Sequence, residues 1–130
     1  MEHVYISENA WPEVLGFLAS LFPGLHTVKA DPRLGRFTGD HADLRHAVIG
    51  DRLISRSEAD FRPDYPENAS YCCVALEKYL ICRPDITAPE LLRAAGARKI
   101  VPVRQGYVRC SALPVDESSL ITADEGIYAA

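Results

Sequence analysis

The sequence lacks both an excess of basic residues and a long run of apolar residues. Its 14 Lys and Arg residues stand against 18 Asp and Glu residues, giving a net charge of −4. Nucleic-acid-binding domains usually carry a basic stripe, and a membrane span needs about 18 consecutive apolar residues. The composition therefore predicts neither a nucleic-acid partner nor a membrane partner.

Signals for export and for metal binding are also missing. The N-terminal segment MEHVYISENAWPEV has neither a basic start nor an apolar stretch, so it does not resemble a signal peptide, and we expect a cytoplasmic protein. The four cysteines include no Cys-x-x-Cys pair of the kind that binds structural zinc. We therefore predict reduced thiols, no metal site and no cofactor.

What is present fits one globular α/β domain. Hydrophobic residues make up 48% of the chain and charged residues 25%, which is ordinary for a globular protein. We assign residues 1–33 to an N-terminal helix and strand, and residues 34–130 to three hairpin modules. Apolar residues at helical spacing predict a helix over 9–22, capped by Asn9 or Ser7. A strand is expected over 25–30.

The three hairpins are each predicted from two apolar runs that flank a turn. Their strand pairs are expected at residues 44–49 with 52–55, 70–75 with 79–82, and 108–115 with 119–122. Gly50 and Asp51 suit a tight turn in the first hairpin. After the second hairpin, Thr87 and Glu90 predict the capping box of a helix that Gly96 ends, and a strand follows over 99–103.

The second strand of every hairpin carries the same short pattern, Leu-Ile followed by a small residue. The three copies are Leu53-Ile54-Ser55, Leu80-Ile81-Cys82 and Leu120-Ile121-Thr122. Repetition of one supersecondary unit is typical of repeat and propeller assemblies. The pattern therefore favours repeated modules of hairpin, helix and strand.

Four longer motifs, which together cover most of residues 34–130, resemble those of a known family. They are His41-Ala42-Asp43-Leu44, Asp64-Tyr65-Pro66-Glu67-Asn68-Ala69, Gln105-Gly106-Tyr107-Val108-Arg109-Cys110-Ser111 and Ile121-Thr122-Ala123-Asp124-Glu125-Gly126-Ile127. The chain resembles uncharacterised bacterial proteins with the guanidino-group-modifying-enzyme fold, also called the pentein or α/β-propeller fold. The resemblance implies modules arranged around a central site, of which three hairpins supply the N-terminal half.

The same resemblance implies the kind of ligand, a small molecule with a guanidino or amine group. A guanidino-modifying hydrolase or amidinotransferase needs a nucleophilic thiolate, an imidazole for proton transfer and carboxylates that bind the guanidinium. In the family these Cys and His residues lie in later modules, at positions that this chain does not contain. Enzymatic activity therefore stays open, and a binding or scaffold protein without catalysis is the alternative.

Six residues are candidates for ligand binding. They are His41, Asp43, Asn68, Gln105, Tyr107 and Asp124. On a strand, His41 and Asp43 share one face, although a hydrogen-bonded entry to the first hairpin explains them equally. Asp124 suits either a ligand carboxylate or the cap of a helix that begins at Glu125. Asn68 suits a short helical turn as well as a ligand.

Cys110 is the remaining candidate, as a nucleophile. On the predicted strand, neighbouring Arg109 points to the opposite face, so a buried structural thiol is the favoured interpretation. A separation of more than about 6 Å between Cys110 and every histidine would exclude a Cys–His pair. A half-ring would also leave apolar edges uncovered, which predicts a homo-oligomer as a further alternative.

Overall fold

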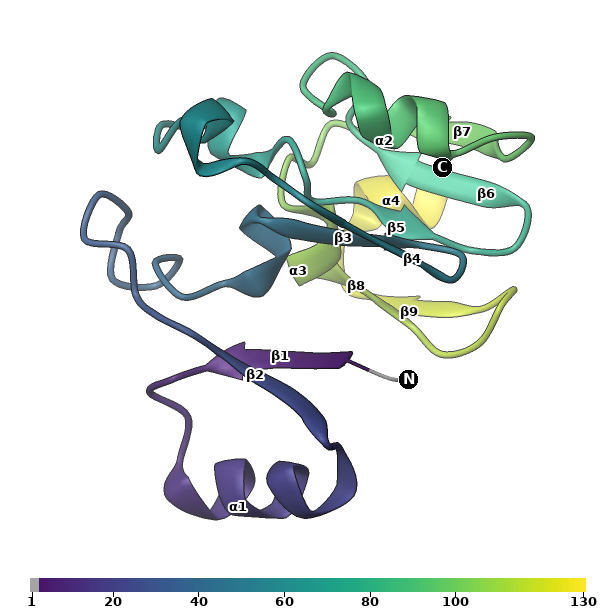
Figure 1. Cartoon of the computed structure of the whole chain (residues 1–130). Coiled ribbons are helices and arrows are strands. Elements are labelled where there is room, and N and C mark those ends of the chain that lie inside the picture. The colour runs from purple at the N-terminus through teal and green to yellow at the C-terminus, as the bar shows by residue number, and fades with distance from the viewer. Residues whose placement is uncertain (1–2) are drawn as a thin grey trace. The chain divides into compact units, whose positions relative to one another are not determined.

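The computed structural model describes residues 3–130, so Met1 and Glu2 of the predicted N-terminal part lie outside it. The chain divides into two compact units, with the division between Ala42 and Asp43. Figure 1 shows the elements of both. Each unit is described by itself below.

The first unit is a strand–helix–strand motif. Strand β1 (His3–Ser7) pairs in parallel with β2 (Gly24–Val28), and helix α1 (Pro12–Leu21) connects them. The helix and the second strand confirm the predictions, whereas β1 was not predicted. The predicted cap by Asn9 or Ser7 is wrong, because Trp11 holds the N-cap position and makes no side-chain hydrogen bond there.

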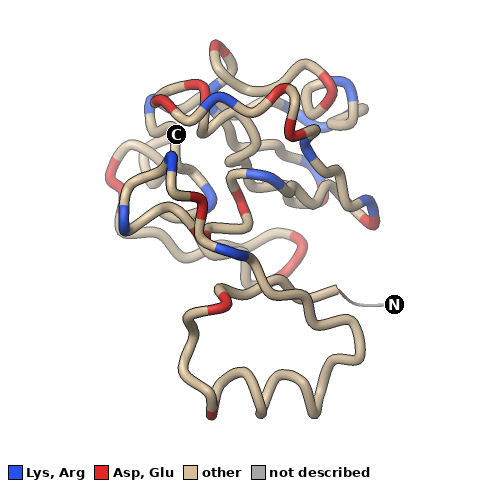
Figure 2. Tube along the Cα trace, turned by 60° about the vertical axis from the view of Figure 1, so that its left-hand side comes forward, with Lys and Arg blue, Asp and Glu red and all other residues tan. Residues whose placement is uncertain are grey.

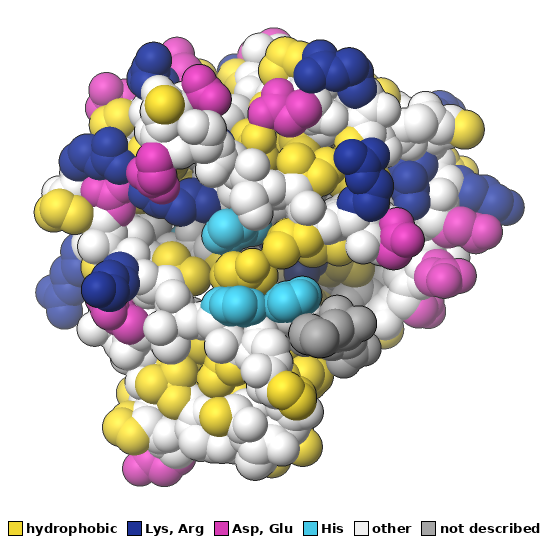
Figure 3. Space-filling view, in the orientation of Figure 1, with side chains coloured by type: hydrophobic (Ala, Val, Ile, Leu, Met, Phe, Trp, Pro, Cys, Tyr) yellow, Lys and Arg dark blue, Asp and Glu magenta, His cyan; other side chains and the backbone are white. Residues whose placement is uncertain are grey.

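Helix α1 leaves its apolar side chains exposed. None of its residues is buried, and Trp11 beside it is 77% exposed while Phe17 is 64% exposed. Figure 3 shows hydrophobic side chains at the surface over this helix. The large buried hydrophobic side chains among residues 3–130 all belong to the second unit.

The second unit opens with the first predicted hairpin. A 3-10 turn, η1 (Ala42–Leu44), leads into β3 (His46–Ile49), which pairs antiparallel with β4 (Arg52–Ser55). Gly50 has a φ of +65°, the left-handed conformation that glycine adopts without steric cost. The turn predicted at Gly50-Asp51 is confirmed. The polar segment that follows contains two short turns, η2 (Glu58–Asp60) and η3 (Glu67–Ala69).

A three-stranded sheet forms the middle of this unit. Its strands are β5 (Val74–Ala75), β6 (Tyr79–Cys82) and β7 (Lys99–Pro102). Strands β5 and β6 form the predicted second hairpin, although its first strand covers only Val74–Ala75 and not 70–75. Helix α2 (Pro89–Ala94) carries the chain across to β7, which runs parallel to β6. The expected order of hairpin, helix and strand is therefore present here.

The predicted capping box of α2 is wrong. Ala88 occupies the N-cap position without a side-chain hydrogen bond. The Thr87 hydroxyl instead donates to the carbonyl of Arg83 (2.8 Å), and the Glu90 carboxylate accepts from the hydroxyl of Tyr71. Thr87 thus closes the local turn before the helix and Glu90 makes a tertiary contact, so Pro89 alone provides the expected start signal.

The third hairpin is shorter than predicted. Residues 108–111 form a helical turn, α3 (Val108–Ser111), and only then does β8 (Ala112–Pro114) pair with β9 (Leu120–Thr122). Val108 and Ala112 are both buried, and residues four apart share a helix face. Helical spacing therefore explains why Val108 and Ala112 are both buried, although a strand was predicted here. Helix α4 (Glu125–Ala129) follows.

Two hydrophobic clusters stabilise the second unit. Leu80, Cys82 and Leu91 belong to the first, while Val74 and Val108 belong to the second. Each of these five side chains is at most 1% exposed. They anchor β6, α2, β5 and α3, which fixes the segments that carry the polar site.

The repeated Leu-Ile pattern does fall on the second strand of each hairpin, but its environments differ. Leu80 is fully buried, whereas Leu53 is 40% exposed. Across residues 3–130 the strands form four separate small sheets, and these close into no barrel. A mixed α/β fold is confirmed.

Charge is distributed without a basic stripe along the described trace. Figure 2 shows Lys and Arg interspersed with Asp and Glu through the second unit. No helix in the described part of the chain is both long enough and apolar enough to cross a membrane.

Candidate functional site

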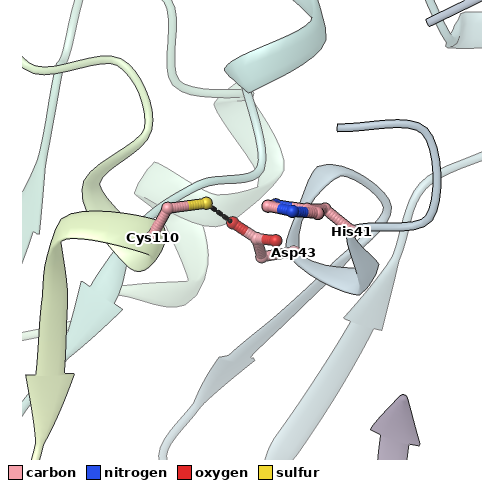
Figure 4. Close-up of side chains that lie close together, drawn as sticks. All are labelled: His41, Asp43 and Cys110. Atoms are coloured by element: carbon pink, nitrogen blue, oxygen red, sulfur yellow. Dashed lines mark hydrogen bonds between the residues drawn. The ribbon is translucent and has the colours of Figure 1, made fainter. Parts of the chain in front are cut away.

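Two thiols converge on the carboxylate of Asp43. The Cys110 thiol donates to Oδ2 of Asp43 (Sγ to Oδ2, 3.0 Å), and the Cys72 thiol donates to the same oxygen (3.3 Å). The three residues come from α3, from the loop before β5 and from η1. Figure 4 shows the Cys110 thiol directed at Asp43. One carboxylate oxygen is therefore shared by groups from three distant parts of the sequence.

His41 precedes Asp43 by two residues and belongs to the same polar cluster. Ligand atoms of His41, Asp43 and Cys110 all lie within 4.8 Å of one another. The Cys–His separation is thus below the 6 Å that would have excluded a pair. Asp43 lies in the 3-10 turn η1 and His41 directly precedes that turn, so the two residues do not share the face of a strand as predicted.

Cys110 differs from the expectation of a buried structural thiol, because the residue is exposed. It borders a surface hollow of about 420 Å³ that α3, β8 and β9 line. The other three cysteines are buried, as predicted. Cys110 is therefore the thiol that a molecule from solution can reach.

Burial of the sulfur atoms, together with Asp43, favours the protonated form of both thiols. Partial desolvation of the sulfur, with the hydrogen bond to Asp43 and the negative charge of that residue, raises the pKa of Cys110 to about 12. Burial, followed by the charge of Asp43, raises the pKa of Cys72 even further. At neutral pH the cluster thus contains thiols and not a thiolate nucleophile.

The other four candidates form a connected chain of hydrogen bonds. Asp124 accepts from the Gln105 amide (3.3 Å), and Gln105 in turn accepts from the backbone N–H of Tyr107 (3.0 Å). The Tyr107 hydroxyl donates to the Asn68 side chain (3.1 Å), whose amide donates to the carbonyl of Pro63 (3.0 Å). These side chains therefore connect η3 to α4 and hold the loop around Gln105.

Asp124 is the N-cap of α4. Its Oδ1 accepts from the backbone N–H of Ile127 (2.9 Å). This bond, followed by the bond from Gln105, lowers the pKa of the Asp124 carboxyl. The capping interpretation of Asp124 is confirmed, and Gln105 occupies its second oxygen.

Gly106 is required by the close approach of an aromatic ring. A Cβ atom built on Gly106 would lie 2.6 Å from the Tyr65 ring. That ring packs against Tyr107 with 5.3 Å between centroids, and the Tyr65 hydroxyl accepts from Arg83 (3.0 Å). The absence of a side chain at Gly106 therefore leaves room for the Tyr65 ring.

Sequence reasoning missed Cys72, Tyr65 and Arg83 as neighbours of the site. The adjacent cysteines did carry one usable signal. Residues next to each other in an extended segment point to opposite sides, and Cys72 reaches Asp43 while Cys73 lies in the first hydrophobic cluster. Nothing in the sequence indicated that Asp43 would be the partner.

Comparison with family models gives a match over most of the chain. Residues 24–130 match the model of DUF6873, a family of unknown function. No curated protein matches the chain. No solved structure matches it either.

Proposed function

Because the chain belongs to DUF6873, a family of unknown function, its role has to be argued from its own residues, and we propose that it binds a small guanidino- or amine-bearing cation at Asp43. The observation that supports this proposal is the convergence of two thiols on one oxygen of that carboxylate. The resemblance to penteins names the ligand class, and the Asp43 cluster supplies the anion that such a ligand needs.

The hydrogen-bond chemistry at Asp43 favours exchange for a cation. Thiols are weak donors, whereas a guanidinium offers paired N–H groups that bind a carboxylate bidentately. A ligand that replaces the Cys110 contact gains charge-assisted hydrogen bonds in place of a weak one. Cys110, which contacts Asp43, is exposed and borders a surface hollow.

A pentein-like architecture is part of this proposal. Its support is the Leu-Ile pattern on the second strand of three hairpins and the crossover of α2 between β6 and β7. In this view the second unit corresponds to consecutive modules of an α/β propeller. Asp43 then lies at the start of the first module.

Binding without turnover is the form of the proposal that the thiol chemistry favours. Guanidino modification starts from a thiolate, and the pKa of Cys110 is raised to about 12 by desolvation and by Asp43. A nucleophile held protonated by its own neighbour is not activated. The chain in this conformation is therefore assigned ligand binding.

Thermal unfolding with and without arginine or agmatine tests the proposal. A ligand at ten times its Kd stabilises the folded state by about 1.4 kcal/mol, which corresponds to a rise in Tm of roughly 4 °C for a domain of this size. We expect that rise in the wild type and its loss in Asp43→Asn.

Asp51→Asn is the matched control, because Asp51 is an exposed carboxylate in the turn between β3 and β4. It should retain the full shift. Equal shifts in Asp43→Asn and the wild type, or no shift in either, would contradict the proposal.

A further inference from the structure

The side chains around Asp43 are also the types that bind zinc. Cys72, Cys110 and His41 bring sulfur and imidazole nitrogen to a carboxylate oxygen, and Zn²⁺ in proteins takes Cys, His and Asp ligands in fours. We propose that His41, Asp43 and Cys110 bind one Zn²⁺ ion, with Cys72, whose thiol contacts the same carboxylate oxygen, as the fourth ligand.

The spacing of the ligand atoms suits such an ion. With Zn–S bonds near 2.3 Å and Zn–O bonds near 2.1 Å, a tetrahedral centre places sulfur and oxygen roughly 3.6 Å apart. The observed Sγ to Oδ2 distances at Asp43 are 3.0 Å from Cys110 and 3.3 Å from Cys72. The two sulfur-to-oxygen distances are thus shorter than the metal needs by roughly 0.3 to 0.6 Å, and Cys72, which lies outside the compact group of His41, Asp43 and Cys110, has to move further to join them.

The backbone around the ligands is well anchored. Leu44, beside Asp43, is fully buried, and so is Val108, at the start of the helical turn that carries Cys110. Cys72 is itself buried, and its backbone N–H donates to the carbonyl of Ala69 (2.9 Å). Pre-positioned ligands with one exposed member, Cys110, provide both a rigid site and an entry path.

The metal proposal is independent of the organic ligand, although both use Asp43. A guanidinium needs the carboxylate and not the sulfur atoms, whereas Zn²⁺ needs both thiols as thiolates. Replacing the cysteines therefore removes only the metal site. The two cations should also compete, since one carboxylate serves both.

Cobalt substitution and metal titration test the zinc site in the intact chain. Co²⁺ added to metal-free protein under reducing conditions should give a thiolate-to-metal charge-transfer band in the near ultraviolet, and Zn²⁺ should abolish it at about one equivalent. Cys110→Ser should lose that band and bind Zn²⁺ at least about a hundredfold more weakly, since even outer-shell changes cost tenfold to a hundredfold.

Cys73→Ala is the matched control, because Cys73 adjoins Cys72 but lies in the hydrophobic cluster. It should keep the band and the affinity. Cys110 is exposed, so Cys110→Ser should fold, and cooperative thermal unfolding checks this. His41→Ala should weaken Zn²⁺ binding by at least about tenfold.

A wild type that gives no charge-transfer band, or a Cys110→Ser variant that binds Zn²⁺ as tightly as the wild type, overturns the proposal. If Cys110→Ser keeps the arginine-induced rise in Tm, binding of the organic cation is distinguished from binding of Zn²⁺. A failure of Zn²⁺ binding without a loss of that rise in Tm then leaves the organic-cation proposal unaffected.

Discussion

At the scale of single residues, Asp43 controls the chemistry of its neighbours. Its carboxylate accepts from two thiols and contributes to the raised pKa of each. A thiol needs a nearby positive group to become a reactive thiolate at neutral pH, and the dominant local charge here is negative. The site therefore stabilises the unreactive form of cysteine.

Asp43→Asn should increase the rate at which Cys110 is alkylated by iodoacetamide in metal-free protein at pH 8. Removing the negative charge lowers the pKa of the thiol, and each unit of that decrease raises the thiolate fraction about tenfold. Mass spectrometry of the peptide that contains Cys110 gives the rate. Identical rates in the two proteins would show that Asp43 does not set the reactivity of Cys110.

Individual site residues could be predicted from the sequence only where their roles are local. The cap at Asp124 depends on Ile127, three residues away, and a sequence pattern captures it. The bond from Cys110 to Asp43 spans 67 positions, and no short motif encodes it. The exposure of Cys110 was missed because strand alternation was assumed where a helical turn occurs.

At the scale of elements, α2 shows a tertiary contact overriding a local signal. Thr87 and Glu90 have the spacing of a capping box, yet Glu90 accepts from the Tyr71 hydroxyl. That bond, followed by a backbone hydrogen bond, lowers the pKa of the Glu90 carboxyl, while burial raises the pKa of Tyr71 to about 12. The pair joins α2 to the segment that carries Cys72.

The lowered pKa of Glu90 predicts a loss of stability in acid. A carboxyl whose pKa is lower in the folded state contributes stability above its unfolded value, here about 4.5, and loses it as the pH falls through the folded value. Wild-type stability measured by urea unfolding should therefore decrease below about pH 4.5.

Glu90→Gln should show a shallower decrease over the same range, since the titrating group is gone. Tyr71→Phe should behave similarly, because it removes the main cause of the shift. If the stability of the wild type and that of Glu90→Gln decrease equally steeply with falling pH, a contribution from this contact is ruled out.

Hairpins were the most predictable elements. The turn at Gly50 depends on backbone conformation alone, so its sequence signal is direct. The third hairpin lost four residues to α3, because a buried pair such as Val108 and Ala112 is compatible with both periods. Strand β1 was missed because its five residues are mostly half-buried and show no alternation.

At the scale of the whole molecule, apolar side chains remain at the surface of the third hairpin. Leu113 and Ile121 face each other in the β8–β9 register and are 59% and 64% exposed. In the described structure these strands pair only with each other. Exposed two-stranded edges with apolar faces favour pairing with another chain, so we predict self-association through this hairpin.

Replacing Leu113 and Ile121 together by lysine should weaken that association at least about tenfold, since each change removes apolar burial worth more than 1 kcal/mol. Size-exclusion chromatography with light scattering over a range of concentrations measures it. Asp51→Lys, which adds the same charge on a different hairpin, should leave it unchanged. A monomeric wild type at all concentrations would remove the basis for this prediction.

The wide separation of Asp43, Cys72 and Cys110 along the chain has a consequence for biosynthesis. A nascent chain that has released only the first two of these residues from the ribosome holds an acid and one thiol, which is too little to retain a metal ion. The site is completed only after α3 has emerged and the second unit has packed around it. Loading of the proposed zinc site therefore waits until Cys110 has left the ribosome, and a product truncated before Cys110 would lack one of its thiols.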